Sequence, residues 1–224
     1  MRYEISRQFV HLSGLFFVLL AQFIGNFTAS LLFFIIALVL FIYSEYVMRS
    51  KRFLGFVEIV ERRVRDVAFK LDRDGIKKPF MGAFWFYFGL GLTFLIFPLE
   101  IATVAGLILS VGDSLSTLIG LRYGEHKIFG RKSLEGSLVF FLSSFLITAA
   151  VLGFLLSETE PVVAPILISF VAFLGSISAT FVELIPEAKK IRNWKNKEIV
   201  DDNWLIPLFS GLVIYVAYIL TGIV

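Results

Sequence analysis

The chain has 224 residues, of which 58% are hydrophobic and only 17% are charged, and its mean hydropathy is +0.85. A water-soluble domain of this composition would expose large apolar patches, so the composition excludes an ordinary soluble protein and indicates a membrane protein. The apolar runs are continuous, and this disfavours a β-barrel, whose strands alternate. Cysteine is absent, which excludes disulfides, thiolate metal sites and a cysteine nucleophile. We therefore expect one all-α membrane domain over residues 1–224.

Apolar stretches of about 20 residues are long enough to cross a hydrocarbon core about 30 Å thick. In chain order they lie at 9–25, 29–48, 80–98, 101–120, 137–156, 162–182 and 204–223. They predict a polytopic bundle of about seven transmembrane helices. All 21 Lys and Arg residues fall in the segments on one side of this arrangement, and the alternate connections contain none. The positive-inside rule then predicts a cytoplasmic amino terminus and a carboxyl terminus on the outside.

The longest cytoplasmic segment, 51–73, is expected to form an amphipathic helix. Its apolar residues recur at alternating steps of four and three, opposite a charged face, and they are Phe53, Val57, Val60, Val64, Val67 and Leu71. This pattern fits a helix in the membrane interface and equally a solvated helix that packs on the other cytoplasmic loops. The pI of about 9.1 reports this topology and contact with anionic headgroups or a polyanionic substrate. Nothing in the sequence indicates nucleic-acid binding.

Asp113 is a charged residue inside the fourth predicted span. A charge at the centre of a membrane costs on the order of 2.5–3.5 kcal/mol on insertion scales, so its presence asks for a reason. Ser110, Ser116, Thr117 and Gly120 lie on the same side of the helix and give it a small, polar face. Asp113 is therefore a candidate functional residue, and the alternative is a structural hydrogen bond to a neighbouring helix.

The loop from 121 to 137 has the composition of a phosphate-binding loop. It contains three glycines, the adjacent cations Arg131 and Lys132, and Ser133 just before a helix that begins near Gly136. Backbone N–H groups can approach phosphates closely at glycines, and Lys or Arg offsets their charge. The alternative is an ordinary basic turn between two spans. The loop is not a Walker motif, because no Gly-x-x-x-x-Gly-Lys-Ser/Thr occurs.

Further carboxylates lie near the cytoplasmic ends of the last two spans. Mg²⁺ takes oxygen ligands and is commonly held by one or two carboxylates together with substrate phosphates. Asp113 with Glu183 or Asp202 is therefore a possible magnesium site. Helix capping is the alternative for Asp202 and Asn203, because both residue types cap helices well.

A third group of polar residues lies near the amino terminus. Glu4, Arg7 and His11 share one helical face by the three- and four-residue spacing. They either pair with one another at the membrane interface or take part in catalysis, and the sequence leaves both open.

The central motifs together resemble a known family. Their residues are Asp113, Ser116, Gly120 and Gly124, followed by Lys132, Ser133, Glu135 and Gly136. They are similar to the Asp-x-x-Ala-x-x-x-Gly-x-x-x-Gly and Lys-Thr-x-Glu-Gly stretches of the dolichol kinase, phytol kinase and CTP-dependent diacylglycerol kinase family, with Ser in place of Ala and of Thr. The segments around His11 and around Glu183 to Pro207 look like the opening and closing segments of that family, so the resemblance runs through most of the chain.

The resemblance implies transfer of the CTP γ-phosphate to the hydroxyl of a membrane lipid alcohol, such as a polyprenol, dolichol, geranylgeraniol or phytol, or to diacylglycerol, giving a lipid phosphate and CDP. It implies Mg²⁺ as a cofactor. The implied catalytic residues are Asp113, Lys132 and Glu135. The implied nucleotide-binding residues are Gly120, Gly124, Arg131, Lys132, Ser133 and Gly136. The implied metal ligands are Asp113, Glu183 and Asp202, with Asp113 either holding the metal or accepting the alcohol proton.

Two other functions compete with this interpretation. A cytidylyltransferase that makes a CDP-lipid from a lipid phosphate would use the same nucleotide, metal and membrane setting. A small transporter would use Asp113 as a coupling or binding site. The identity of the lipid alcohol, the preference for CTP over other nucleotides and the oligomeric state are not fixed by residue spacing.

Overall fold

The computed structural model describes residues 2–49, 61–62, 80–155, 164–191 and 200–222. This part of the chain consists of membrane-type helices and one short hairpin. The helices are α1 (Arg2–Ile24), α2 (Asn26–Arg49), α4 (Met81–Ile96), α5 (Leu99–Leu107), the π-helix η1 (Ile108–Gly112), α6 (Asp113–Tyr123), α7 (Leu134–Leu155), α8 (Ala164–Ile191) and α9 (Asp202–Thr221). The strands β1 (Lys127–Phe129) and β2 (Lys132–Ser133) pair antiparallel. The architecture confirms the expected all-α polytopic bundle.

Each predicted apolar stretch forms a helix, and the stretch at 101–120 is one continuous rod built from α5, η1 and α6. Within the described part of the chain, five helices are long and apolar enough to cross a membrane: α2, the α5–η1–α6 rod, α7, α8 and α9. The apolar parts of α1 and α4 are shorter. Two predicted helix ends were wrong: α1 begins at Arg2 instead of residue 9, and α8 continues to Ile191 instead of residue 182. Both helices include polar residues beyond the apolar part that the prediction was based on. The expected amphipathic helix at 51–73 lies outside the described residues, apart from the helical residues 61 and 62.

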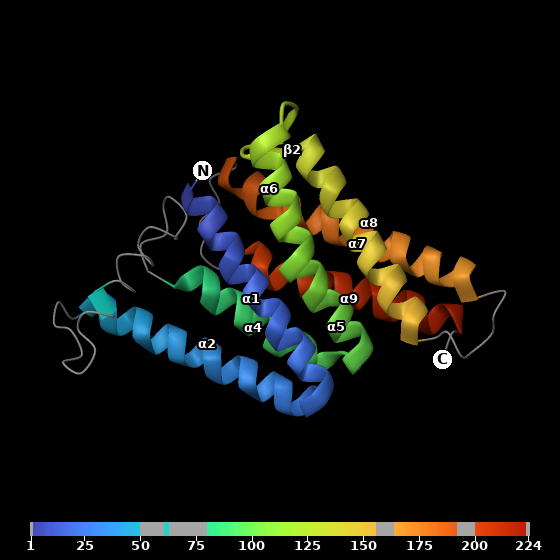
Figure 1. Cartoon of the computed structure of the whole chain (residues 1–224), viewed down its shortest axis with the longest axis horizontal. Helices are drawn as coiled ribbons and strands as arrows, with labels where there is room; N and C mark the ends of the chain where they lie inside the picture. The colour runs from blue at the N-terminus through green and yellow to red at the C-terminus, as the bar shows by residue number, and fades with distance from the viewer. Residues whose placement is uncertain (1, 50–60, 63–79, 156–163, 192–199, 223–224) are drawn as a thin grey trace.

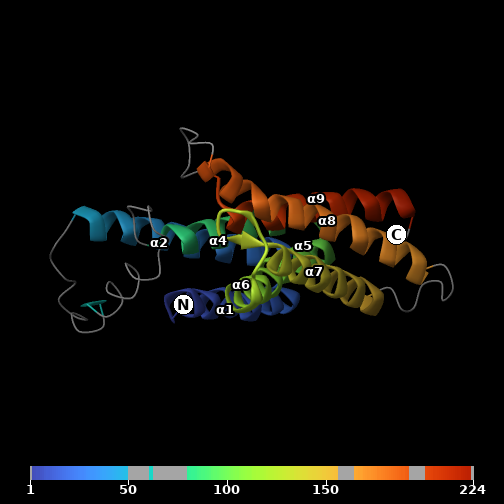
Figure 2. The ribbon, with the colours of Figure 1, turned by 90° about the horizontal axis from the view of Figure 1, so that it is seen from above.

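The rod is the centre of the bundle. In α5 all six residues from Ile101 to Gly106 are buried. Seen from above, α8 and α9 lie on one side and α1 on the other, with α4 and α5 between them (Figure 2). The amino terminus and the hairpin lie at one end of the molecule and the carboxyl terminus at the opposite end (Figure 1). The expected cytoplasmic amino terminus and outside carboxyl terminus stay a prediction.

The break between α4 and α5 shows how backbone groups are satisfied away from water. Pro98 has no N–H and interrupts the helix, and the Phe97 carbonyl accepts a hydrogen bond of 2.7 Å from the Asn26 side chain of α2. Similarly, the Ser30 hydroxyl donates to the Gly91 carbonyl at 2.9 Å. Such bonds tie α2 to α4, because an unpaired backbone group in lipid costs several kcal/mol.

The crossing of α4 and α9 depends on a glycine. A Cβ built on Gly89 would lie 2.5 Å from the Trp204 Cα and 2.8 Å from the Asn203 carbonyl oxygen. These neighbours are backbone atoms, so they cannot move aside without shifting α9. The two helices can therefore approach this closely only with glycine at position 89.

We expect Gly89→Ala to destabilise the protein by about 1–3 kcal/mol, because overpacking forces α4 and α9 apart. The measurement is the midpoint of thermal unfolding in detergent. Gly153→Ala in α7 is the matched control, since no described atom lies within 4 Å of a Cβ at that position. Its midpoint should stay unchanged or rise slightly, because Ala favours helix over Gly. Equal midpoints for the two variants would contradict the observed α4–α9 crossing.

Candidate functional site

Asp113 lies at the point where the central rod changes its hydrogen-bond register. The Asp113 N–H donates to the Ile108 carbonyl, five residues back, at the end of the π-helix η1. A π turn places one extra residue in a helix, and such turns are frequent at functional sites. The Asp113 side chain is 2% exposed. The sequence predicts a regular helix here, and the π turn changes the direction of α6 relative to that prediction.

A buried charged cluster forms around Asp113, with contributions from α6, β2 and α8. The Lys132 Nζ lies 2.7 Å from the Glu183 Oε1 and 4.0 Å from the Asp113 Oδ1. The Ser116 hydroxyl lies 3.1 Å from the same Glu183 oxygen and donates to it. Lys132 is thus the cation shared by two carboxylates that come from different helices. The structure therefore brings together Asp113, Lys132 and Glu183, which are far apart in the sequence.

The cluster places two buried carboxyl groups beside one ammonium group. Two buried carboxylates face the single Lys132 ammonium, and the Asp113 Oδ1 and the Glu183 Oε2 have no hydrogen-bond partner among the described residues. Buried carboxylates normally have such partners or bind a metal. Oxygen atoms of this kind suit Mg²⁺. Among the described residues no group of three or more His, Cys, Asp or Glu side chains could hold a metal by itself, so an ion here would also need oxygen atoms from a substrate phosphate or water.

Asp202 is not the N-cap residue of α9, so the capping alternative is wrong for this residue. The side chain that caps α9 belongs to Asp201, which accepts a 3.0 Å hydrogen bond from the Asn203 N–H. The Asn203 side-chain amide nitrogen, Nδ2, donates a hydrogen bond of 3.3 Å to the Gly82 carbonyl oxygen of α4. Asp202 itself is 2% exposed in the first turn of α9. Its predicted role as a metal ligand stays a prediction.

His11 reaches the cluster from α1. Its Nδ1 lies 3.5 Å from the Asp113 Oδ2, and the two side chains are 7% and 2% exposed. Of the three amino-terminal residues selected from the sequence, His11 therefore contacts the candidate site. The side chains of Glu4 and Arg7 lie outside the described part of the chain.

The predicted nucleotide-binding residues of the loop lie next to one another, in a tightly packed arrangement. The Ser133 hydroxyl oxygen accepts a 3.2 Å hydrogen bond from the Gly136 N–H, as an N-cap residue does. A Cβ would lie 3.2 Å from that oxygen at Gly120, 2.4 Å at Gly124 and 3.3 Å at Gly136. The three glycines thus let α6 and α7 pack around the Ser133 hydroxyl. Binding of a nucleotide by these residues stays a prediction.

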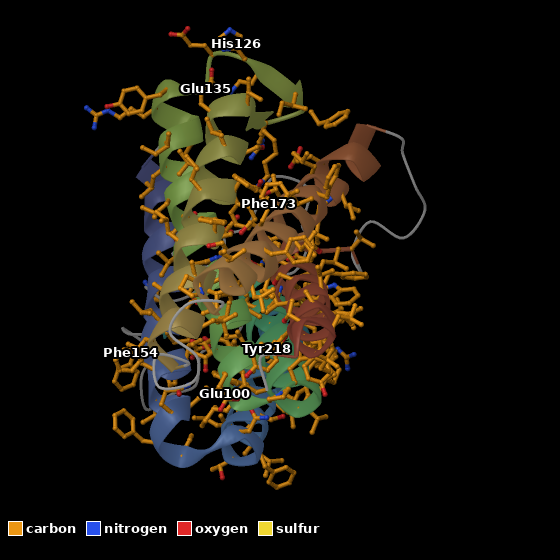
Figure 3. The ribbon with its side chains drawn as sticks, turned by 90° about the vertical axis from the view of Figure 1, so that its right-hand side faces the viewer. Glu100, His126, Glu135, Phe154, Phe173 and Tyr218 are labelled. Atoms are coloured by element: carbon orange, nitrogen blue, oxygen red, sulfur yellow. The ribbon has the colours of Figure 1, made fainter. Side chains whose placement is uncertain are left out.

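Glu135 and Arg131 lie on the outer part of the hairpin region. The Glu135 Oε1 is 2.6 Å from the Nδ1 of the exposed His126, and the pair lies at the hairpin end of the molecule in Figure 3. Glu100 and Tyr218 lie toward the other end in the same view. Arg131 is exposed in the turn between β1 and β2. The predicted catalytic role of Glu135 would have to act from this surface position.

Sequence reasoning missed Glu187, which lies beneath the hairpin turn. A Cβ on Gly130, whose φ is +52°, would lie 2.6 Å from the Glu187 Oε2, and Glu187 is 6% exposed. Its spacing of four residues from Glu183 places both acids on one face of α8, and this was the available signal. Glu183 pairs with Lys132 of the hairpin, and Glu187 lies against the hairpin turn at Gly130.

Comparison with known proteins gives two kinds of named relatives. The chain is 28% identical over 216 residues to CTP-dependent diacylglycerol kinase 1 of Schizosaccharomyces pombe, covering 96% of this chain and 93% of that protein. It is 31% identical over 130 residues to phytol kinase of a Synechocystis species, covering 57% of this chain and 46% of that protein. An uncharacterised protein of Rickettsia prowazekii is 29% identical over 92% of this chain and 90% of its own length. No protein-family profile and no solved structure matches the chain.

The ion pair of Lys132 and Glu183 should account for most of the contribution that the charged cluster makes to the stability of the protein. We expect Lys132→Met to destabilise the protein by about 3 kcal/mol or more, because it leaves two buried carboxylates without their cation. Combining it with Glu183→Gln should recover part of that loss, so the double variant should unfold at a higher temperature than the sum of the single effects gives. Lys127→Met, at an exposed position of β1, is the control and should leave the thermal midpoint nearly unchanged. Additive effects of Lys132→Met and Glu183→Gln would contradict the pairing.

Proposed function

We propose that this chain, a phytol kinase-like and diacylglycerol kinase-like membrane protein by its similarity to those lipid kinases, transfers the γ-phosphoryl group of CTP to the hydroxyl of a membrane lipid alcohol. The products would be a lipid phosphate and CDP, with the hydroxyl proton released. The observation that carries the proposal is the buried cluster of Asp113, Lys132 and Glu183, which lies in a helical membrane bundle and combines a cation with carboxylate oxygens free to bind a ligand.

Phosphoryl transfer depends chiefly on positioning and on neutralising charge, so it requires few groups from the protein. Lys132 is the proposed partner of the triphosphate, with Arg131 nearby in the loop. The Lys132 side chain is 15% exposed, whereas Glu183 is 1% exposed. A triphosphate that approaches from the hairpin end would therefore compete with Glu183 for the ammonium group.

The same residues fit a magnesium ion. Asp113 Oδ1 and Glu183 Oε2 are buried oxygens without hydrogen-bond partners among the described residues, and we propose that they hold the ion together with substrate phosphates. When bound, the ion would offset charge on the phosphates. Asp113 is alternatively the acceptor of the alcohol proton, since its carboxylate is the group of the cluster that lies within the central rod.

The lipid would approach from the apolar side of the helices. Leu115 of α6 and Leu138 of α7 are 42% and 56% exposed, and they lie next in sequence to the buried Ser116 and Ser137. An apolar tail can therefore lie along the outer faces of α6 and α7 while its hydroxyl group reaches the polar side of these helices.

The test uses purified protein in detergent with Mg²⁺, γ-labelled CTP and a panel of geranylgeraniol, longer polyprenols, phytol and diacylglycerol. We expect label in an extractable lipid phosphate, and a loss of about 100-fold or more in Asp113→Asn, because a carboxylate in either proposed role is then missing. Glu100→Gln is the matched control, since Glu100 is an exposed carboxylate at the other end of the same rod, and its activity should equal that of the wild type.

Other products would exclude the kinase. Labelled pyrophosphate released when a lipid phosphate is the acceptor would identify a cytidylyltransferase. Absence of both products, with ATP as well as CTP, would exclude chemistry on the nucleotide and favour transport.

A further inference from the structure

The two oxygens of the Asp113 carboxylate have different neighbours. Oδ1 faces the Lys132 ammonium at 4.0 Å, and Oδ2 faces the His11 Nδ1 at 3.5 Å. The carboxylate is therefore held between β2 on one side and α1 on the other. The His11 side chain is buried beside Asp113, so it is separated from bulk water in the structure.

The His11 ring is held in place by an aromatic contact. The Phe86 ring of α4 lies 5.0 Å from it, centroid to centroid, at an interplanar angle of 49°. Phe86 in turn fills the space left by Gly14, one turn further along α1, where a Cβ would lie 2.2 Å from the Phe86 Cζ. Phe86 is 2% exposed. This packing restricts the imidazole to the side of α1 that faces Asp113.

We propose that His11 is a positioning residue for Asp113, an inference that rests on the proposed phosphoryl transfer. In the structure Nδ1 and Oδ2 are in contact at 3.5 Å without a hydrogen bond. An N–H at Nδ1 that donates to Oδ2 once the contact shortens would fix the rotation of the carboxylate, so that Oδ1 is presented toward Lys132 and the substrate. The separation of 3.5 Å is longer than an ideal hydrogen bond, and contacts of this kind tighten when substrate binds. Partners that orient a ligand or base typically contribute 10–100-fold to activity.

Two substitutions at position 11 separate positioning from packing. In His11→Asn the amide nitrogen can take the place of Nδ1 and still donate, whereas His11→Leu keeps an apolar contact with Phe86 and has no donor. Positioning predicts that Leu lowers kcat by about 10-fold or more with little change in KM for the lipid, and that Asn retains most of kcat. A packing role alone predicts the opposite order, because Leu suits the buried site better than Asn. Phe16→Leu, at a position of α1 that is 65% exposed, is the control and should leave kcat unchanged.

A second measurement does not depend on activity. His11→Leu and Asp113→Ala should have non-additive effects on the thermal midpoint in detergent, because each removes the contact between Nδ1 and Oδ2. In kinetics, His11→Leu should add no further loss to Asp113→Asn. Additive effects on the midpoint, or Leu more active than Asn, would overturn the proposal for His11. A wild-type protein that labels no lipid would instead refute the proposed function, and the midpoints alone would then decide whether His11 holds Asp113.

Discussion

The burial of two carboxylates around one ammonium group is the constraint on which the rest of this structure depends. Removing such charges from water is expensive, so Asp113 and Glu183 can lie within the helical bundle only if a cation reaches them. That cation, Lys132, belongs to the loop between α6 and α7, and the loop must fold back over α8 to deliver it. The short β1–β2 hairpin and its turn at Gly130 above Glu187 are consequences of this requirement. A loop that looks like a simple connection in the sequence is thereby fixed in place.

The central rod supplies the other half of the arrangement. Residues 101 to 106 of its α5 part are buried and belong to the core, while its α6 part carries Asp113 and Ser116 toward α8. Glycines on α6 and α7 let these two helices approach closely enough for Ser133 to cap α7 at the same level. The candidate site is therefore built on helices and on one hairpin, which is anchored to α8 by the pair of Lys132 and Glu183. Contacts from α1 through His11 complete the surroundings of Asp113.

Much of the fold could be predicted because membrane spans are governed by one strong variable, the length of apolar sequence. The sequence predicts Asp113 together with Glu183 or Asp202 near one membrane face, whereas the position of Lys132 between Asp113 and Glu183 depends on how the loop packs on α8. The π turn could not be predicted, because a shift in backbone hydrogen bonding leaves no mark on hydropathy. The choice of Asp201 over Asp202 as the cap depends on a shift of one residue, which composition cannot resolve. The pairing of Glu135 with His126 and of His11 with Asp113 depends on how separate segments pack, and a single sequence does not contain that information directly.

The π turn between Ile108 and Gly112 makes the length of this span as informative as its composition. Each residue of a regular helix advances the helix by about 100°, and the π turn takes up one residue more than a regular turn does. If the same residues formed regular α-helix instead, one half of the rod would be rotated against the other by roughly that angle. The span would remain just as hydrophobic and would still insert into a membrane. Asp113 and the face below it would no longer keep their direction relative to α5, so the same residues with a regular hydrogen-bond register would share a topology and differ in whether the carboxylate cluster can form. In this protein the register of a single turn, rather than any additional polar residue, decides whether the span can present Asp113 to the carboxylate cluster.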